Sequence, residues 1–140
     1  MSATPSFLAE TEADLRRLAA QLTDPRDGEC LVCYVYRMMD HGCTGLRWAR
    51  RYRDLRAPRA TGLERRLGAL GGYCDCEILF NSFELAPEYW VPAKEETDED
   101  GITTITDPEY PDPLPPCQRV RRGSTQACGL WLRRGRYNRW

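Results

Sequence analysis

Residues 71–81 read GGYCDCEILFN, and the periodicity of the chain changes within this stretch. The two glycines are typical of the end of a helix. From Cys74 to Phe80, cysteine or apolar residues occupy every second position, which is the repeat of a strand with one buried face. The alternation therefore predicts a short strand on which Cys74 and Cys76 both point inward.

Upstream of this strand, apolar residues recur at helical spacing in four segments that end at proline or glycine. The segments are bounded by Thr4-Pro5 and Pro25, by Asp27 and Gly42, by Thr44 and Pro58, and by Leu63 and Gly71. We expect one helix in each segment. The sequence thus predicts an α+β fold, in which a small helical N-terminal unit is closed by a short cysteine-bearing strand.

The charges of the chain are segregated, although its formal net charge is only −1. Residues 1–83 carry 12 Arg and 11 Asp or Glu, residues 84–116 carry one Lys and ten acids with seven prolines, and residues 117–140 carry seven Arg and no acid. We therefore expect a helical core over residues 1–83 and an acidic, Pro-rich linker or arm over residues 84–116, with residues 102–106 as its candidate strand. A basic tail over residues 117–140 would follow.

Targeting and membrane segments are not evident in this sequence. No stretch approaches the ~20 consecutive apolar residues of a membrane span. The first ten residues, MSATPSFLAE, lack the basic and apolar regions of a secretory signal. We expect a cytoplasmic protein, in which cysteines stay reduced and can serve as metal ligands.

Two cysteine pairs are candidate ligands of one metal ion. Cys30 and Cys33 would be neighbours on a helix surface, and Cys74 and Cys76 would share one strand face, so each pair can direct two sulfurs at a common point. Four thiolates suit zinc. A core of only about 80 residues is also of the size that benefits from a structural metal.

Other residues could contribute to this site. Cys43 is a fifth candidate ligand, and the neighbouring His41 is a possible metal ligand or only a neighbour of the site. Cys117 and Cys128 flank the tail, where they would form a redox-labile clasp or part of a second site, because two ligands alone do not define a metal centre. The alternatives are inert buried thiols and redox chemistry.

The stretch GCTGLRWARRYRDLRAPRATGLERRLGALGGYCDCEILFN, residues 42–81, resembles the uncharacterised family known as domain of unknown function 2695. The resemblance covers about residues 30–81, and its most specific part is Gly-Gly-aromatic-Cys-Asp-Cys-Glu. Many family members carry Asp where this chain has Thr44. The resemblance implies that Cys43, Cys74 and Cys76 are ligands, with a fourth supplied by Cys30, Cys33 or a nearby carboxylate. It implies no reaction.

The sequence favours a non-enzymatic role. It holds no H-E-x-x-H, P-loop or G-x-S-x-G motif. Glu77 follows Cys76 but lies on the opposite face of the predicted strand, away from a metal-bound water. The alternative is a thiol or zinc redox sensor, because C-x-x-C can form a disulfide and oxidation releases zinc from thiolates.

Arginines interleaved with aromatic residues suggest a partner that carries phosphate, because guanidinium groups contact phosphates and aromatic rings stack on unpaired bases. The candidate binding residues are Arg47, Arg50, Arg51, Arg53, Arg119, Arg121, Arg122, Arg133, Arg134, Arg136, Trp131 and Trp140. We expect an adaptor that binds RNA, the ribosome or a protein partner. The combination loosely resembles zinc-responsive factors that recruit partners in ribosome hibernation.

Overall fold

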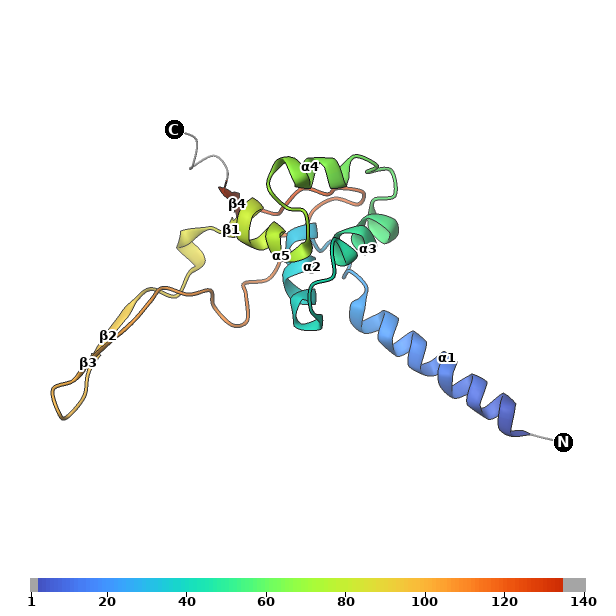
Figure 1. The fold of residues 1–140 in the computed structure, drawn as a ribbon, viewed down its shortest axis with the longest axis horizontal. Coiled ribbons are helices and arrows are strands. Elements are labelled where there is room, and N and C mark those ends of the chain that lie inside the picture. The colour runs from blue at the N-terminus through green and yellow to red at the C-terminus, as the bar shows by residue number, and fades with distance from the viewer. Residues whose placement is uncertain (1–2, 135–140) are drawn as a thin grey trace.

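The computed structural model describes residues 3–134, with side chains from residue 8 onward (Figure 1). The helices are α1 (Ala3–Thr23), α2 (Leu31–Met38), α3 (Arg47–Arg56), α4 (Leu63–Ala69) and α5 (Asp75–Glu77), with shorter helical turns at Met39–His41, Ile78–Ser82 and Pro87–Tyr89. The strands are β1 (Phe83–Leu85), β2 (Lys94–Thr97), β3 (Thr103–Thr106) and β4 (Trp131–Arg133). The α+β class is confirmed, and all four predicted upstream helices are present.

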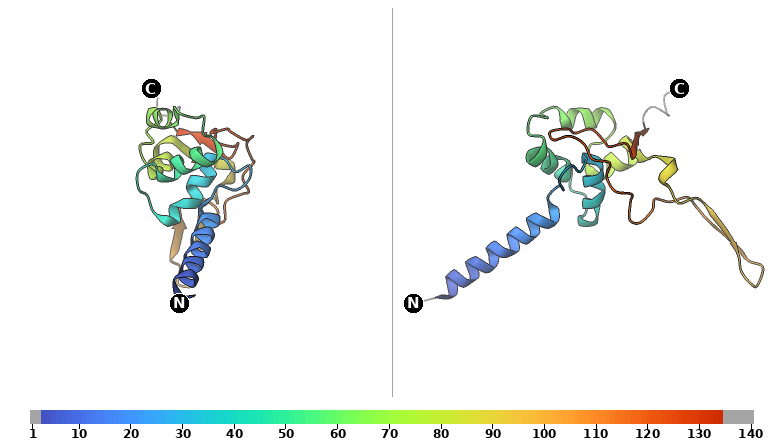
Figure 2. Two further views of the ribbon diagram at one scale, coloured as in Figure 1. Left: turned by 90° about the vertical axis from the view of Figure 1, so that its right-hand side faces the viewer. Right: turned by 180° about the vertical axis from the view of Figure 1, so that it is seen from behind.

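Helix α1 extends away from the rest of the described chain (Figures 1 and 2). Its leucines, which predict an amphipathic helix, remain more than half exposed: Leu8, Leu15, Leu18 and Leu22. The contacts with the core are at its C-terminal end, where the Tyr34 hydroxyl donates to the Thr23 carbonyl. The periodicity thus located this helix correctly, but its apolar face packs against nothing in the described chain.

The buried core is built around α2, which is apolar on nearly every side. Its members include Leu31, Val32, Tyr34, Val35 and Met38 of α2, Trp48, Ala49 and Tyr52 of α3, Leu63 and Leu67 of α4, and Ile78, Leu85, Leu130 and Trp131. The C-terminal segment is therefore part of this core. Leu130 is only 1% exposed, although the sequence places it in the basic tail.

The strand predicted over residues 73–80 is wrong, because this stretch forms α5 and the helical turn that follows it. Asp75 is fully buried and accepts hydrogen bonds from the backbone N–H groups of Trp48 (2.9 Å) and Ala49 (3.1 Å) at the start of α3. A buried carboxylate requires such donors, and here they outweigh the alternating pattern. Ile78 is consequently buried, whereas Phe80 is 72% exposed.

Two small antiparallel sheets complete the described chain. Strand β1 pairs with β4, so that Leu85 lies opposite Trp131. Strands β2 and β3 form an exposed hairpin that projects from the core (Figure 1). The strand predicted at residues 102–106 is confirmed as β3. Among residues 3–134, no helix combines the length and the hydropathy needed to cross a membrane.

Candidate metal centre

Four cysteines from distant parts of the chain meet beside α2. The sulfur atoms of Cys30, Cys33, Cys117 and Cys128 all lie within 4.8 Å of one another. Cys30 is the N-cap of α2 and Cys33 lies in its first turn, whereas Cys128 precedes β4. Three of the four are buried and Cys117 is half-buried.

The spacing of the sulfurs fits a tetrahedral thiolate site. The Cys33 and Cys128 sulfurs are 3.8 Å apart. A tetrahedral ion with bonds of about 2.3 Å to sulfur, the usual Zn–S length, places its ligands about 3.8 Å apart. These four cysteines could therefore hold a metal ion with little rearrangement.

N–H groups surround the sulfurs, as is typical of metal thiolates. Within the C-x-x-C turn, the Cys33 N–H donates to the Cys30 sulfur at 3.3 Å. The Cys117 sulfur accepts from the N–H groups of Cys30 (3.2 Å) and Arg119 (3.3 Å). The indole of Trp131 donates to the Cys33 sulfur at 3.2 Å. These donors stabilise negative charge on sulfur.

The thiols compete for a single negative charge. Hydrogen bonds from the Cys30 and Cys33 thiols lower the pKa of Cys128. The hydrogen bond to Cys128 correspondingly raises the pKa of Cys30 and of Cys33, and the contact with Cys30 and burial also raise that of Cys33. A divalent cation removes this competition, because it stabilises every coordinated thiolate at once.

The backbone around Cys117 and Cys128 is shaped for close approach to α2. Arg119, whose N–H donates to the Cys117 sulfur, has a φ of 68°, a left-handed conformation that turns the chain sharply after the cysteine. The Val120 N–H then donates to the Gly28 carbonyl at 2.9 Å. The absence of a side chain at Gly129 leaves room for the Gln118 side chain beside it.

The sequence predicts that Cys30 and Cys33 share a metal site with Cys74 and Cys76. The structure instead brings Cys117 and Cys128 next to Cys30 and Cys33. Cys43, Cys74 and Cys76 form a separate group at the surface, and none of them belongs to the four-cysteine cluster. The physical reason is the buried Asp75 between Cys74 and Cys76, which ties this pair to the start of α3.

His41 is exposed and outside the four-cysteine cluster, and its ring packs 5.7 Å from that of Trp48. The one sequence signal for the cysteines that meet Cys30 and Cys33 was the presence of two more cysteines near the C-terminus. Cys117 and Cys128 are the only cysteines after the acidic segment. Nothing local, however, indicates that they return to α2.

Several predicted binding arginines are committed to internal ion pairs. Arg50 pairs with Glu64 at 2.8 Å, and Arg53 reaches the same carboxylate at 3.3 Å. Arg51 pairs with Asp24 at 2.6 Å, which fastens α3 to the end of α1. These three side chains thus contribute to the fold.

The remaining candidates divide between structural and free side chains. Arg47 lies over the Trp48 ring at 4.3 Å, and Arg134 donates to the Phe83 carbonyl at 3.0 Å. Trp131 is only 5% exposed, so its ring is not available to stack on a base. Among the predicted binding residues, four exposed arginines have neither an ion pair with a described residue nor a ring contact: Arg119, Arg121, Arg122 and Arg133. Arg136 and Trp140 lie outside the described residues.

A family comparison matches a little over a third of the chain. No curated protein and no solved structure matches the chain. The matched region includes Cys33 and the surface cysteines Cys43, Cys74 and Cys76, whereas Cys117 and Cys128 lie beyond it. The resemblance drawn from the sequence is confirmed: residues 31–81 match the family described as protein of unknown function (DUF2695).

Proposed function

We propose that this protein is a non-enzymatic zinc-binding adaptor that recognises RNA, alone or within an assembly such as the ribosome. The observation that carries the proposal is the four-cysteine cluster and its position in the chain. Cys117 and Cys128 bracket residues 118–127, so a metal held by the cluster would fasten both ends of this segment to α2. We call residues 118–127 the arginine loop, because Arg119, Arg121 and Arg122 lie on it.

The arginine loop packs on the helical core between its two cysteines. The Tyr52 hydroxyl of α3 shares its one proton between the Glu29 carbonyl, at 2.9 Å, and the Ser124 carbonyl of the loop, at 3.2 Å. Arg66 of α4 donates to the Thr125 hydroxyl at 3.3 Å. Zinc binding would therefore control where the arginines are held, and this supports zinc-dependent recognition.

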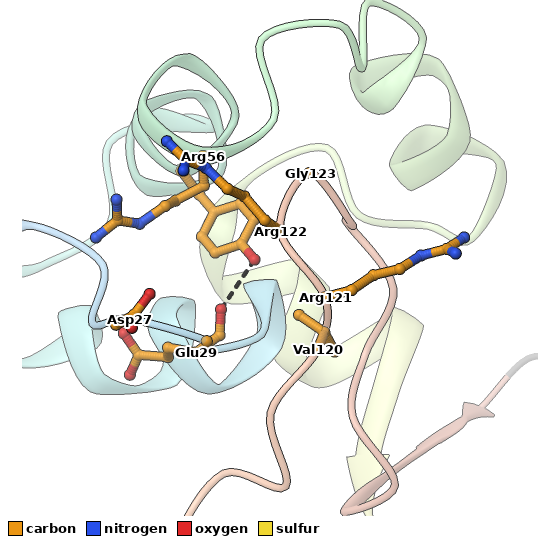
Figure 3. A pocket seen from close by; sticks show the side chains of 9 residues that line it. Asp27, Glu29, Arg56, Val120, Arg121, Arg122 and Gly123 are labelled. Carbon is orange, nitrogen blue, oxygen red and sulfur yellow. Dashed lines mark hydrogen bonds between the residues drawn. The ribbon is translucent and has the colours of Figure 1, made fainter.

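A pocket of about 220 Å³ lies where the arginine loop meets α3, and Arg56, Arg121 and Arg122 line it (Figure 3). In Figure 3 the Arg122 side chain extends toward Arg56, whereas the Arg121 side chain points away from both, on the other side of the loop. The Arg56 Nε is buried without a hydrogen-bond partner, and Arg121 and Arg122 have no ion pair in the described chain. The Glu29 carboxylate, also at the pocket, is bound by Arg37. The Asp27 carboxylate also lines the pocket, so a phosphate there would be bound by the two guanidinium groups of Arg56 and Arg122.

The non-enzymatic part of the proposal rests on the ligand set. Catalytic zinc sites keep one position open for water or substrate, whereas structural sites have four protein ligands. Four cysteines would fill the coordination of zinc here. No titratable base is needed for such a site to stabilise the fold.

An RNA-binding assay with zinc-loaded protein tests this proposal. The probe is a fluorescent RNA hairpin with a single-stranded loop, titrated at several salt concentrations. Arg121→Glu with Arg122→Glu should weaken binding, and the slope of log affinity against log salt should fall by about 0.7 for each lost single-strand phosphate contact. Arg16→Glu with Arg17→Glu on α1 makes the same change in charge away from the pocket, and should have a smaller effect.

Zinc content is measured on every variant, so that lost binding is not confused with lost metal. Chelation of zinc from the wild-type protein should also weaken binding, because the ends of the arginine loop are released. The proposal is overturned if the protein does not bind RNA, if both double variants lose affinity equally, or if only a protein partner is retained after nuclease treatment.

A second candidate function, a zinc or redox sensor, is favoured by one observation. A groove of about 760 Å³ opens beside the cluster, and both Cys33 and Cys117 line it. Through it, peroxide could oxidise two thiolates to a disulfide, release zinc and be reduced to water. Peroxide at micromolar concentration should then release zinc faster from the folded protein than from a buried control site, and slow release would exclude this role.

A further inference from the structure

Helix α1 carries an apolar stripe that nothing in the described chain covers. Leu8, Leu15 and Leu22 lie seven residues apart, and Leu18 follows Leu15 by three residues on the same face of the helix. All four residues are more than half exposed. Most of the stability of a helix in a protein comes from packing of such a face. The leucine stripe, as we call these four residues, is therefore a surface suited to a partner.

The C-terminal end of α1 is fixed to the core, so the leucine stripe projects from it in a set direction. The Tyr34 hydroxyl and the Arg51 Nε both donate to the Thr23 carbonyl. Arg51 also pairs with Asp24 at 2.6 Å. From this anchor the helix runs outward, away from the other helices (Figures 1 and 2). Another helix can therefore reach the stripe.

The charges of α1 are divided between the two halves of the leucine stripe. Residues 10–14 carry three acids, and Arg16 and Arg17 follow them. Asp14 and Arg17 pair with each other within the helix. Glu12 and Arg16 form no ion pair within the part of the chain that the structure describes. These two residues are four apart and lie along the same flank of the stripe.

This division of charge makes α1 complementary to a reversed copy of itself. When two copies run antiparallel with Leu15 near the centre, Leu8 of one copy lies near Leu22 of the other. Glu12 of each copy then lies near Arg16 of the other, whereas a parallel pair would place like charges side by side. We propose that α1 is a dimerisation helix, whose leucine stripe packs against α1 of a second copy of this chain in an antiparallel coiled coil.

The charge of α1 favours a second copy over a lipid surface. Helices that lie on membranes are rich in Lys and Arg on their polar face, whereas residues 8–23 carry three acids and two arginines. In the antiparallel pair the two cores lie at opposite ends of the paired helices, about 30 Å apart for helices of 21 residues. Each arginine loop can then bind an RNA by itself, so the inference does not rest on the proposed function.

Sedimentation equilibrium of the full-length, zinc-loaded protein under reducing conditions tests the proposal. The mean mass should rise from 16.1 kDa toward twice that value as the protein concentration increases through the micromolar range. Leu15→Glu with Leu22→Glu should weaken association by about 100-fold or more, because two leucines in each copy lose their burial. The matched control, Ala9→Glu with Ala13→Glu, adds the same charge on the opposite face and should leave association unchanged.

An exchange of charges tests the direction of pairing. Glu12→Arg should weaken association about 5-fold at low salt, because each dimer loses two ion pairs. Glu12→Arg with Arg16→Glu should restore it, because the exchanged charges again face each other in an antiparallel pair. Zinc content and circular dichroism of every variant show whether the core and the helices are intact.

Four outcomes would overturn the proposal. The protein stays monomeric throughout the concentration range, or the leucine variant associates as tightly as the wild-type protein, which would place the interface elsewhere. Glu12→Arg leaves association unchanged, which would exclude the antiparallel pair. Finally, monomeric protein binds vesicles of anionic lipid and the leucine variant does not, which would make α1 a membrane-surface helix.

Discussion

Replacement of Cys128 by serine tests the four-cysteine cluster most directly. The substitution removes one sulfur from the centre and nearly preserves the size of the side chain, at a position that is buried in the core. Its matched control is Cys74→Ser, which removes a sulfur from the surface group. The sequence predicts Cys74 and Cys76 as partners of Cys30 and Cys33 in the metal site, so the pair of variants separates the predicted ligand set from the four-cysteine cluster.

The expected loss of stability follows from the separation of the ligands along the chain. Cys33 and Cys128 lie 95 residues apart. A covalent cross-link that closes a loop of about 100 residues stabilises a fold by about 4.7 kcal/mol. Zinc at about 1,000 times its dissociation constant contributes about 4.1 kcal/mol by mass action. Both routes give about 4 kcal/mol, or a fall in Tm of roughly 10–15 °C for a chain of this size.

The assay is thermal unfolding with zinc or with a chelator, together with zinc analysis of the purified protein. The wild-type protein and Cys74→Ser should bind one zinc and lose about 10–15 °C of Tm on chelation. Cys128→Ser should have a low Tm that chelation barely changes. If Cys128→Ser keeps stoichiometric zinc and the full shift in Tm, or if Cys74→Ser abolishes the shift, the assignment of the metal centre is refuted.

Three further substitutions test contacts around these sites. Asp75→Ala leaves two backbone N–H groups at the start of α3 buried without acceptors, and should cost about 2–4 kcal/mol in urea unfolding; a loss below 1 kcal/mol would contradict the capping role. Trp131→Phe removes the indole donor to Cys33 and should weaken zinc binding about 10-fold by chelator competition, whereas unchanged affinity would mean that the hydrogen bond is incidental. Tyr52→Phe removes the hydroxyl that binds the Ser124 carbonyl, and should lower the free energy of unfolding by about 1 kcal/mol. Equal urea midpoints for the variant and the wild-type protein would contradict this.

Local patterns in the sequence were sufficient to predict where the four upstream helices lie. The leucine spacing and the Pro25 boundary predicted α1, and α1 ends at Thr23. Helix periodicity depends on neighbours three and four residues apart, so it survives without knowledge of the tertiary fold. The pattern could not show that the leucines of α1 would stay exposed, because that depends on what the rest of the chain offers to cover them.

Periodicity alone predicted the wrong structure for residues 73–80. Cys74 and Cys76 have the spacing of a strand, but the segment is helical. One buried carboxylate favours the helix over the strand. Asp75 needs donors, and the unsatisfied N–H groups at the start of α3 supply them. A polar residue at an outward position of a strand and a buried helix cap are indistinguishable in sequence until the partner helix is in place.

The sequence by itself determined that this chain has helices upstream of residue 70, an acidic segment before an arginine-rich one, and enough cysteines for a metal. Only the tertiary structure decided which cysteines meet. Cys30 and Cys33 are joined by Cys117 and Cys128, because burial of Leu130 and Trp131 against α2 brings the C-terminal segment back to the start of that helix. Contacts across 87 to 95 residues arise from packing of the whole core, and no local pattern encodes them.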